Sequence, residues 1–342
     1  FTTSADGADI DLNSSSNAFA GAVSLSTEGS GGYAEISNGS TNLITGTSTV
    51  GGNLELTTTG SVTLGTSDSP TTVDGNLDVT AGTTVGQGGV LTITGTTDIS
   101  ASNGSNNITL NDFDNDFSKT VGETLGGAVS LRGHNTRIKD VNEIDLGTII
   151  TYGMFLVQAG GAVTDSGVLT LAGRLQIEAE THDVTLDTTS NNLHGSNKKA
   201  FINAANVILV DASAIEFGAS TISGTFKLTA GGAVTQADAL EVASTTTIEA
   251  KSGDTYYAIT LDSQDGSSEY DNDFQGAVLL TGSNVEVDDL NDLELGTSTV
   301  TGTYIARSQT GDITDAASAE LTITGTSTFV TIANGKTITL NS

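Results

Sequence analysis

Ile108-Thr109-Leu110-Asn111 is one copy of a short phrase that recurs along the chain. It returns at 184–187, 259–262 and 338–341, and a degenerate copy stands at 10–13. The four full copies place their leucines at Leu110, Leu186, Leu261 and Leu340, so the period is nearly constant. Because self-similarity at a fixed period indicates structural units stacked on one another, we expect one continuous repetitive domain over 1–342. Its larger repeats are expected at approximately 10–107, 108–183, 184–258 and 259–342.

A smaller unit lies inside the larger repeat. Gly-Thr-Ser stands at 46–48 and again at 65–67, and Gly-Asn-Leu stands at 52–54 and again at 75–77. Around them, short runs of Val, Ile, Thr and Leu alternate apolar and polar residues and end at Gly, Asn, Asp or Ser, a pattern typical of half-buried strands. We therefore expect an all-β solenoid with almost no helix. Its coils should be about 19–23 residues long, grouped in larger repeats of about 76 residues.

Composition excludes several classes of function. Cysteine is absent, so the chain has no disulfide, thiol nucleophile or iron–sulfur cluster. The net charge is −30, with 41 acidic and 11 Lys or Arg residues, which argues against nucleic acid or an anionic membrane as a partner. No apolar run reaches the roughly 18 residues that membrane insertion requires. The negative charge favours solubility and hinders edge-to-edge pairing of a long β-rod.

Three phrases carry a resemblance to a known family. They are Gly-Thr-Ser-Thr-Val-Thr-Gly (296–302), Ala-Gly-Gly-Ala-Val-Thr-Asp-Ser-Gly (159–167) and Leu-Thr-Ile-Thr-Gly-Thr (321–326). Coils of this style, which cover nearly the whole chain, resemble the repeats of filamentous-haemagglutinin-like adhesins, the large secreted exoproteins of Gram-negative bacteria. The resemblance implies a right-handed parallel β-helix that is extracellular, at the bacterial cell surface. The fold class we expect is therefore an all-β, right-handed parallel β-helix (β-solenoid).

The two ends of the chain share one phase of the repeat. Residues 1–14 align without gaps on residues 329–342, with Phe, Thr, Ala, Gly, Ile, Leu, Asn and Ser in common. Solenoids that stand alone usually have atypical polar terminal repeats, and neither end has one. We expect the chain to be a segment of a longer repetitive protein. The alternative is head-to-tail stacking of copies into a filament.

Two acidic corners at the same phase are candidate calcium sites. Asp112, Asp114 and Asp116 alternate with other residues, and Asp271 and Asp273 form the matching corner. Calcium takes roughly six to eight oxygen ligands, which closely spaced carboxylates can supply. Asp and Asn are also common at such corners because they bond their own backbone. Calcium is therefore a possible cofactor, with turn chemistry as the alternative, and we expect no other cofactor.

Two further sets recur at fixed phase, and we interpret both as structural. A phenylalanine ends each corner. Because it recurs at the same position of the repeat, we expect its side chain to be a buried plug and not an exposed platform for sugars. An aspartate recurs in three repeats, where a carboxylate that accepts backbone N–H bonds explains it. The aromatic residues are Phe19, Phe117, Phe201 and Phe274, and the aspartates are Asp140, Asp211 and Asp289.

Basic residues gather in one repeat of this acidic chain. Arg132, His134, Arg137 and Lys139 align, at an offset of 149, with Thr281, Ser283, Glu286 and Asp288. Drift on a solvated face is one account. The other is an assembly contact in which the basic strand pairs with an acidic strand of a neighbouring rod. The candidate assembly residues are Arg132, Arg137, Lys139, Glu286 and Asp288.

These patterns favour a non-enzymatic function. The three histidines, His134, His182 and His194, are scattered, and no nucleophile motif surrounds any serine. We expect a secreted structural or adhesive rod that self-associates laterally or head-to-tail in a filament or extracellular matrix, with a glycan or host-surface ligand as a further possible partner. The alternative is a polysaccharide-binding or polysaccharide-degrading β-helix protein, because a pair of carboxylates across a cleft would suffice for hydrolysis. The sequence does not separate an adhesin from a matrix filament.

Overall fold

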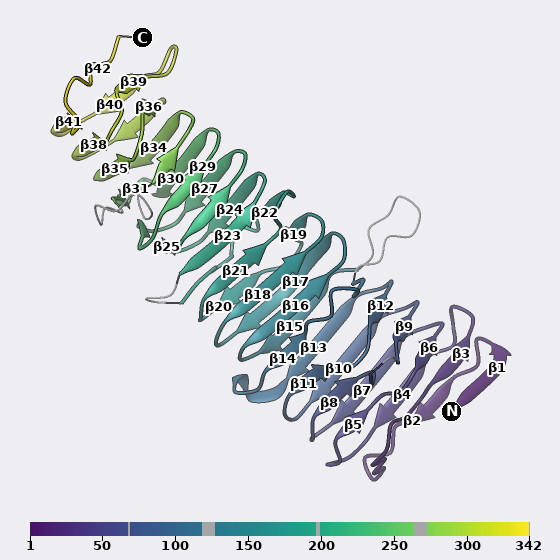
Figure 1. The fold of residues 1–342 in the computed structure, drawn as a ribbon. Helices are drawn as coiled ribbons and strands as arrows, with labels where there is room; N and C mark the ends of the chain where they lie inside the picture. The colour runs from purple at the N-terminus through teal and green to yellow at the C-terminus, as the bar shows by residue number, and fades with distance from the viewer. Residues whose placement is uncertain (68, 118–126, 196–198, 263–271, 342) are drawn as a thin grey trace. The chain divides into compact units, whose positions relative to one another are not determined.

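The chain folds as a β-solenoid of parallel strands, as predicted from its repeats (Figure 1). The structure is a computed structural model that describes residues 1–67, 69–117, 127–195, 199–262 and 272–341. It divides into two compact units, Phe1–Gly173 and Arg174–Ser342. The helix in the described residues is a single 3-10 turn, η1 (Ser102–Gly104), and no helix among them is long and apolar enough to cross a membrane.

In the N-terminal unit the strands form three stacks, so each coil has three sides. The first stack is β1 (Thr2–Asp6), β3 (Ser26–Glu28), β6 (Ser48–Val50), β9 (Thr71–Val73) and β12 (Leu91–Ile93). The second is β2 (Ile10–Leu12), β4 (Ala34–Ser37), β7 (Leu54–Thr58), β10 (Leu77–Ala81), β13 (Thr97–Ala101), β15 (Val129–Gly133) and β17 (Ile144–Thr151), which continues into β19 (Val163–Asp165) and β20 (Leu169–Leu171). The third is β5 (Leu43–Ile44), β8 (Val62–Leu64), β11 (Val85–Gln87), β14 (Ile108–Leu110), β16 (Thr136–Asp140) and β18 (Phe155–Ala159).

In the C-terminal unit the strands fall into two hydrogen-bonded series, which continue the second and third stacks of the N-terminal unit. One series is β22 (Val184–Leu186), β24 (Val207–Asp211), β27 (Phe226–Ala230), β30 (Thr246–Ser252), β34 (Val278–Gly282), β36 (Leu293–Leu295), β37 (Ser298–Val300), β39 (Ile313–Asp315), β40 (Leu321–Ile323) and β42 (Ile338–Thr339). The other is β21 (Leu175–Glu178), β23 (Ala200–Ala204), β25 (Ile215–Phe217), β26 (Ser220–Ile222), β28 (Val234–Gln236), β29 (Leu240–Val242), β32 (Ile259–Leu261), β33 (Asp273–Phe274), β35 (Val285–Asp289), β38 (Tyr304–Ser308) and β41 (Ser327–Thr331). β31 (Thr255–Tyr256) pairs antiparallel with the end of β30.

The strand register confirms the expected coil length. Leu54 pairs with Leu77, and Leu77 pairs with Thr97 in the next coil. Two coils are much longer, at 32 residues each, because Thr97 pairs with Val129 and Thr246 pairs with Val278. Both long coils contain an Ile-Thr-Leu strand and carry the acidic corner after it. The insertions therefore stand at one phase of the repeat.

Alternation within each strand builds the core. In β7 the side chains of Leu54 and Leu56 are fully buried, and Glu55 between them is exposed. In-register stacking places the buried residues of successive coils on one another, and this gives a continuous apolar interior from many short strands. Five phenylalanines and one tyrosine are among the largest fully buried side chains, so aromatics fill the interior more than their low number suggests. They are Phe117, Phe155, Phe217, Phe226, Phe274 and Tyr304.

Asparagines at the corners fix one coil on the next. Asn135 Oδ1 accepts the backbone N–H of Met154, 3.0 Å away in the following coil. A Cβ on the preceding residue, Gly153, would lie 2.4 Å from that Oδ1. Only glycine leaves room for the bond, and the same arrangement recurs at Asn76 with Gly95, Asn206 with Gly224 and Asn284 with Gly302. The recurrent Asn and Gly of the sequence are therefore one structural device.

Candidate functional site

A buried carboxylate closes each long coil, as expected for the recurrent aspartate. Asp140 Oδ2 accepts the backbone N–H of Phe117 at 2.7 Å, and its Oδ1 accepts that of Asn142 at 2.9 Å. Burial raises the pKa of Asp140 to about 7, against the lowering effect of these two bonds. Asp289 holds Phe274 and Asn291 in the same way at 2.8 and 2.7 Å, and burial likewise raises its pKa to about 7. We call this arrangement the aspartate clamp.

The aspartate clamp shows that two of the four phenylalanines predicted to be buried plugs are not. Asp211 accepts the backbone N–H of Leu193 at 2.9 Å, so the plug of that repeat is Leu193, which is fully buried. Phe201 lies in β23 instead, half-buried, with the Arg174 guanidinium 5.0 Å from its ring centroid. In the first repeat Asn38 takes the place of the aspartate and accepts the N–H of Phe19, which is only half-buried. The prediction of a buried plug is confirmed for Phe117 and Phe274 and is wrong for Phe201 and Phe19.

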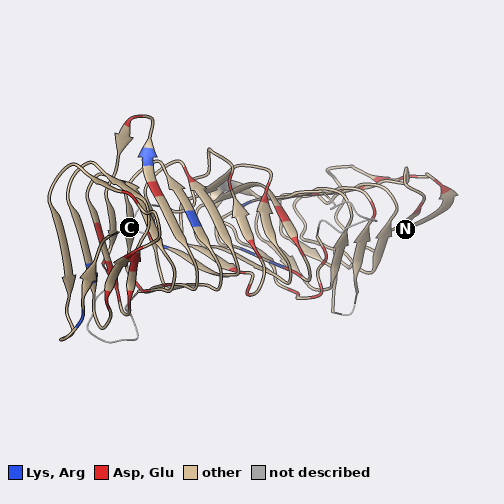
Figure 2. Cartoon of the chain, turned by 90° about the horizontal axis from the view of Figure 1, so that it is seen from above, with Lys and Arg blue, Asp and Glu red and all other residues tan. Residues whose placement is uncertain are grey.

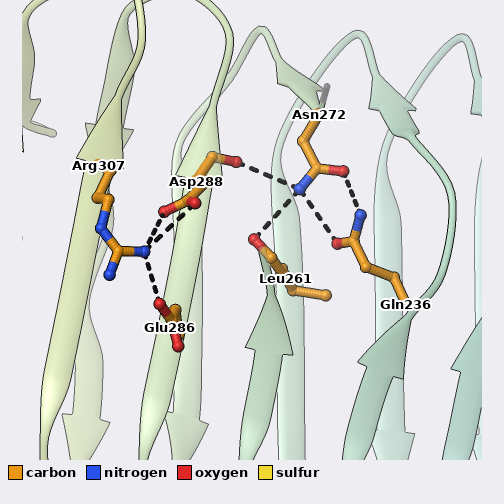
Figure 3. A network of polar contacts seen from close by, with 6 residues as sticks. All are labelled: Gln236, Leu261, Asn272, Glu286, Asp288 and Arg307. Atoms are coloured by element: carbon orange, nitrogen blue, oxygen red, sulfur yellow. Dashed lines mark hydrogen bonds and ion pairs between the residues drawn. The ribbon is translucent and has the colours of Figure 1, made fainter. Parts of the chain in front are cut away.

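An amide network that the sequence did not reveal stands beside the clamp (Figure 3). Asn272 Nδ2 donates to Gln236 Oε1 and to the carbonyls of Leu261 and Asp288, at 3.1 to 3.2 Å. Gln236 Nε2 returns a bond to Asn272 Oδ1 at 2.6 Å. Gln87 and Asn115 form the same reciprocal pair in the N-terminal unit. Because every polar atom of this buried asparagine that can bond does so, the network joins three successive coils and is structural.

The acidic corner at 112–116 is a turn whose carboxylates bond within the corner and to the next coil. Asp112 Oδ1 accepts the N–H of Asp114 at 3.1 Å, and Asp116 Oδ1 accepts Asn142 Nδ2 at 3.2 Å. In the matching corner Asp273 accepts Asn291 Nδ2 at 3.2 Å, and Asp271 lies outside the described residues. Among the described residues no group of three or more His, Asp or Glu side chains is arranged to hold a metal ion. Turn and corner bonds therefore account for the carboxylates of Asp112, Asp116 and Asp273, and calcium binding stays a prediction.

Arg132, Arg137 and Lys139 lie around one corner of a coil, Arg132 on β15 and the other two on β16, and none of them has an acidic partner among the described residues. Arg132 Nη2 donates to the Tyr152 hydroxyl at 3.3 Å, and Lys139 Nζ lies 3.3 Å from the ring centroid of Phe113. Arg137 is exposed and borders a shallow pocket between β14, β16 and β18. We call Arg132, Arg137 and Lys139 the basic cluster. Phe113 and Tyr152 are 56% and 44% exposed, so each of these two sides of the coil carries a cation beside an exposed aromatic ring.

The acidic residues expected to pair with such a cluster are engaged within their own unit. Arg307 Nη1 lies 2.5 Å from Glu286 Oε1 and 3.1 Å from Asp288 Oδ1 (Figure 3). Asp288 is almost fully buried, and burial raises its pKa to about 6 although the Arg307 charge opposes the shift. In the N-terminal unit the strand pair at this phase has Lys139 beside Gln158, so a cation stands there without an acidic partner across the strands. A contact of Glu286 and Asp288 with a neighbouring rod stays a prediction.

A line of carboxylates runs across the second stack of the N-terminal unit. Register places Asp11 beside Glu35, Glu35 beside Glu55, Glu55 beside Asp78 and Asp78 beside Asp98. All five point away from the core, and Glu35 alone is half-buried while the others are exposed. Neighbouring strands lie roughly 4.8 Å apart. Mutual repulsion accordingly contributes, after burial, to the raised pKa of Glu55 and of Asp78. We call these five residues the carboxylate ladder.

The fold does not require this ladder. In the C-terminal unit the corresponding outward positions of β24, β27, β30 and β34 are Ile208, Lys227, Thr247 and Leu279. Charge is also segregated along the chain, because no Lys, Arg or His precedes Lys119, while 13 Asp and Glu residues do. Figure 2 shows the ribbon near the N-terminus with red acidic segments and no blue. Like charges on adjacent strands destabilise a sheet, so the ladder is a surface feature with a cost in stability.

The described histidines make structural contacts. His134 Nδ1 lies 3.0 Å from the carbonyl of Gly104, and His194 Nε2 accepts the backbone N–H of Glu216 at 2.9 Å. His182 Nδ1 lies 3.3 Å from the carbonyl of Ala179, within one turn. Each ring is thus engaged with the backbone, and the absence of enzymatic activity stays a prediction.

Comparison with protein families gives one match. A family described as repeats of unknown function (DUF5649) matches residues 1–26, 62–124, 133–198, 204–281 and 282–342, which together make up most of the chain. The chain belongs to the DUF5649 repeat family. No curated protein and no solved structure matches it. The DUF5649 segments include Asp78, Asp98, Arg137 and Lys139, whereas Glu35 and Glu55 fall in the unmatched stretch 27–61, so the ladder extends beyond the matched repeats.

Proposed function

We propose that the chain is part of a non-enzymatic, secreted rod with a structural or adhesive role, in a filament or matrix at a bacterial surface. The observation that carries the proposal is the repetitive outer face of the solenoid, of which the carboxylate ladder is the clearest case. Side chains that repeat on adjacent parallel strands offer many equal contacts along one line. Such a surface suits repeated weak binding, in which linked contacts add to a strong total attachment.

Two further features support this role. The buried polar groups close coils and corners, as the clamp and the Asn272 network do. The resemblance of the Gly-, Thr- and Val-rich phrases to filamentous-haemagglutinin-like exoproteins agrees with display outside the cell, and the absence of cysteine leaves nothing for thiol oxidation there. The fine surface differences between coils, acidic in one place and basic in another, then supply specificity.

Electron microscopy and binding assays on the purified chain test this function. We expect concentration-dependent assemblies of rods, or attachment to glycan-coated or host-cell surfaces, and no release of sugar from polysaccharides. Imaging with calcium and with a chelator shows in the same experiment whether calcium at the acidic corners promotes assembly. Monodisperse chains that bind no surface under any of these conditions would contradict the proposal.

Polysaccharide binding or degradation is the second candidate. It is favoured by the exposed Tyr152 ring beside Arg132, since an aromatic face and a cation suit a sugar ring that bears a carboxylate. Calorimetry with polygalacturonate would detect binding, and a reducing-end assay would detect cleavage. If the wild type binds polygalacturonate tightly and cleaves it, and Tyr152→Ala abolishes the binding, the chain is an enzyme and the proposed structural role is wrong.

A further inference from the structure

We propose that the basic cluster of one copy of this chain docks on the carboxylate ladder of a second copy. The inference rests on the proposed function, because it names the contact by which rods associate. It replaces Glu286 and Asp288 as the acidic side of that contact, since both already pair with Arg307 within their own unit.

The cationic side is built and available. Arg132 and Lys139 have neutral partners, a tyrosine hydroxyl and a phenylalanine ring, so no carboxylate among the described residues offsets either cation. Arg137 forms no hydrogen bond or ion pair with the described residues and borders the shallow pocket between β14, β16 and β18. An exposed guanidinium without a partner can bind a carboxylate through two charge-assisted hydrogen bonds.

The carboxylate ladder is opposite in charge to the basic cluster and, in the part of the chain that the structure describes, is likewise without an ion-pair partner. No ion pair among the described residues involves the ladder, and the chain has no basic residue before Lys119 that could supply one. Five carboxylates stand against three cations, so a docked copy relieves the repulsion along the ladder as well as forming new pairs. The long flexible stems of Arg and Lys accommodate the difference between the ladder spacing and the spacing of alternate residues on a strand.

Position on the fold limits the kinds of assembly. The ladder spans β2 to β13, Arg132 lies on β15, the next strand of the same stack, and Arg137 and Lys139 lie on β16 in the third stack. The ladder and the basic cluster are therefore different, adjacent patches. A docked pair with one ladder–cluster contact keeps one free ladder and one free cluster, so further copies can add. A pair in which each cluster docks on the other copy's ladder closes as a two-fold dimer.

Charge reversal on each side provides the test, with the full chain as the protein. The ladder variant is Glu35→Lys with Glu55→Lys and Asp78→Lys, and the cluster variant is Arg132→Glu with Arg137→Glu and Lys139→Glu. The control is Glu28→Lys with Asp74→Lys and Asp254→Lys, three exposed positions that change the net charge as the ladder variant does. Circular dichroism establishes first that each variant is folded.

We expect the wild type to grow in size with concentration by light scattering, and a plateau at a dimer would identify the closed reciprocal arrangement. Raising the salt from 50 to 500 mM should weaken its association at least tenfold, because the contact is between exposed charges. Each reversed variant alone should lose association at least tenfold. An equimolar mixture of the two should recover it, since every cluster then meets a ladder of opposite sign, and the control should behave as the wild type.

The outcomes separate this inference from the function on which it rests. Association of the wild type that both variants retain, or a mixture that stays unassociated, overturns the docking contact and leaves the rod intact. A wild type that stays monomeric at millimolar concentration overturns the docking contact and self-assembly together. If the cluster binds polygalacturonate tightly while copies do not associate, the partner of the cluster is an anionic polysaccharide, and the inference is again overturned.

Discussion

Asp289 Oδ2 accepts the backbone N–H of Phe274 at 2.8 Å, across a boundary between two coils. The same carboxylate accepts the N–H of Asn291 through Oδ1, so one buried side chain satisfies two backbone donors. Buried donors without a partner are costly. β33 also pairs with β29, and the clamp supplies the acceptor that the Phe274 N–H would otherwise lack.

Asp289→Ala should destabilise this coil by about 2–3 kcal/mol, because two buried N–H groups lose their acceptor. Hydrogen exchange provides the measurement, since it reports the opening of individual segments. The amides of Phe274 and Asn291 should exchange faster by about two orders of magnitude. Asp254→Ala, at an exposed aspartate, is the control and should leave both amides protected. Equal protection in the two variants would show that the clamp does not hold the coil.

The clamp also predicts how stability depends on pH. Burial raises the pKa of Asp140 and of Asp289 to about 7 and that of Asp288 to about 6, from a usual value of 3.8. A carboxyl whose pKa is higher in the folded state stabilises the fold when protonated, fully below pH 3.8, and this stabilisation is lost as the pH rises to about 7. The thermal midpoint should therefore be higher at pH 5.5 than at pH 8, by several degrees.

General relief of the net negative charge also stabilises the chain on acidification, so a matched control is needed. Asp140→Asn with Asp289→Asn should reduce the rise in midpoint between pH 8 and pH 5.5. Asp74→Asn with Asp254→Asn removes the same two charges from exposed positions and should leave the rise unchanged. A midpoint that falls on acidification in the wild type would mean that the backbone N–H bonds, and not burial, set these pKa values.

The Asn272 network predicts a strong asymmetry between two asparagines. Asn272→Asp places an acceptor where Nδ2 now donates to the carbonyls of Leu261 and Asp288, and should cost about 3 kcal/mol. Asn284→Asp should be nearly neutral, since Asn284 uses its Oδ1 to accept from Thr303, and Asp312 has that role in a later coil. Denaturation in urea at pH 8 measures both. Similar losses of unfolding free energy in the two variants would show that the Asn272 network does not stabilise the fold more than a corner asparagine does.

Local sequence patterns predicted the coils correctly because alternation, Gly and Asn act over a few residues. Leu54 and Leu56 face inward and Glu55 outward as period-two alternation requires. The clamp aspartates were found because each stands at a fixed short distance before Asn142, Ser213 or Asn291. In these cases the geometry that matters lies within one strand or turn.

The features that sequence patterns missed depend on register between coils of unequal length. Recurrence of phenylalanine predicts Phe201 as the plug of its repeat, whereas the clamp holds Leu193 at that position. The ladder residues follow one another at unequal intervals along the chain, because the coils between them differ in length. They are Asp11, Glu35, Glu55, Asp78 and Asp98. No fixed period links them, and only the strand pairing places them in one line.

The ladder makes a last prediction that is independent of any partner. Glu55 lies between Glu35 and Asp78, whereas Glu249 occupies an outward strand position between Thr229 and Thr281. Glu55→Gln should therefore stabilise the chain by about 0.5 kcal/mol at 20 mM salt, by removing a charge from between two like charges. Glu249→Gln, the same chemical change without an acidic residue beside it on either adjacent strand, should bring no gain. At 500 mM salt the two variants should converge, because screening acts within a few ångströms. A gain for Glu249→Gln equal to that for Glu55→Gln would trace the effect to net charge and not to the in-register line of carboxylates.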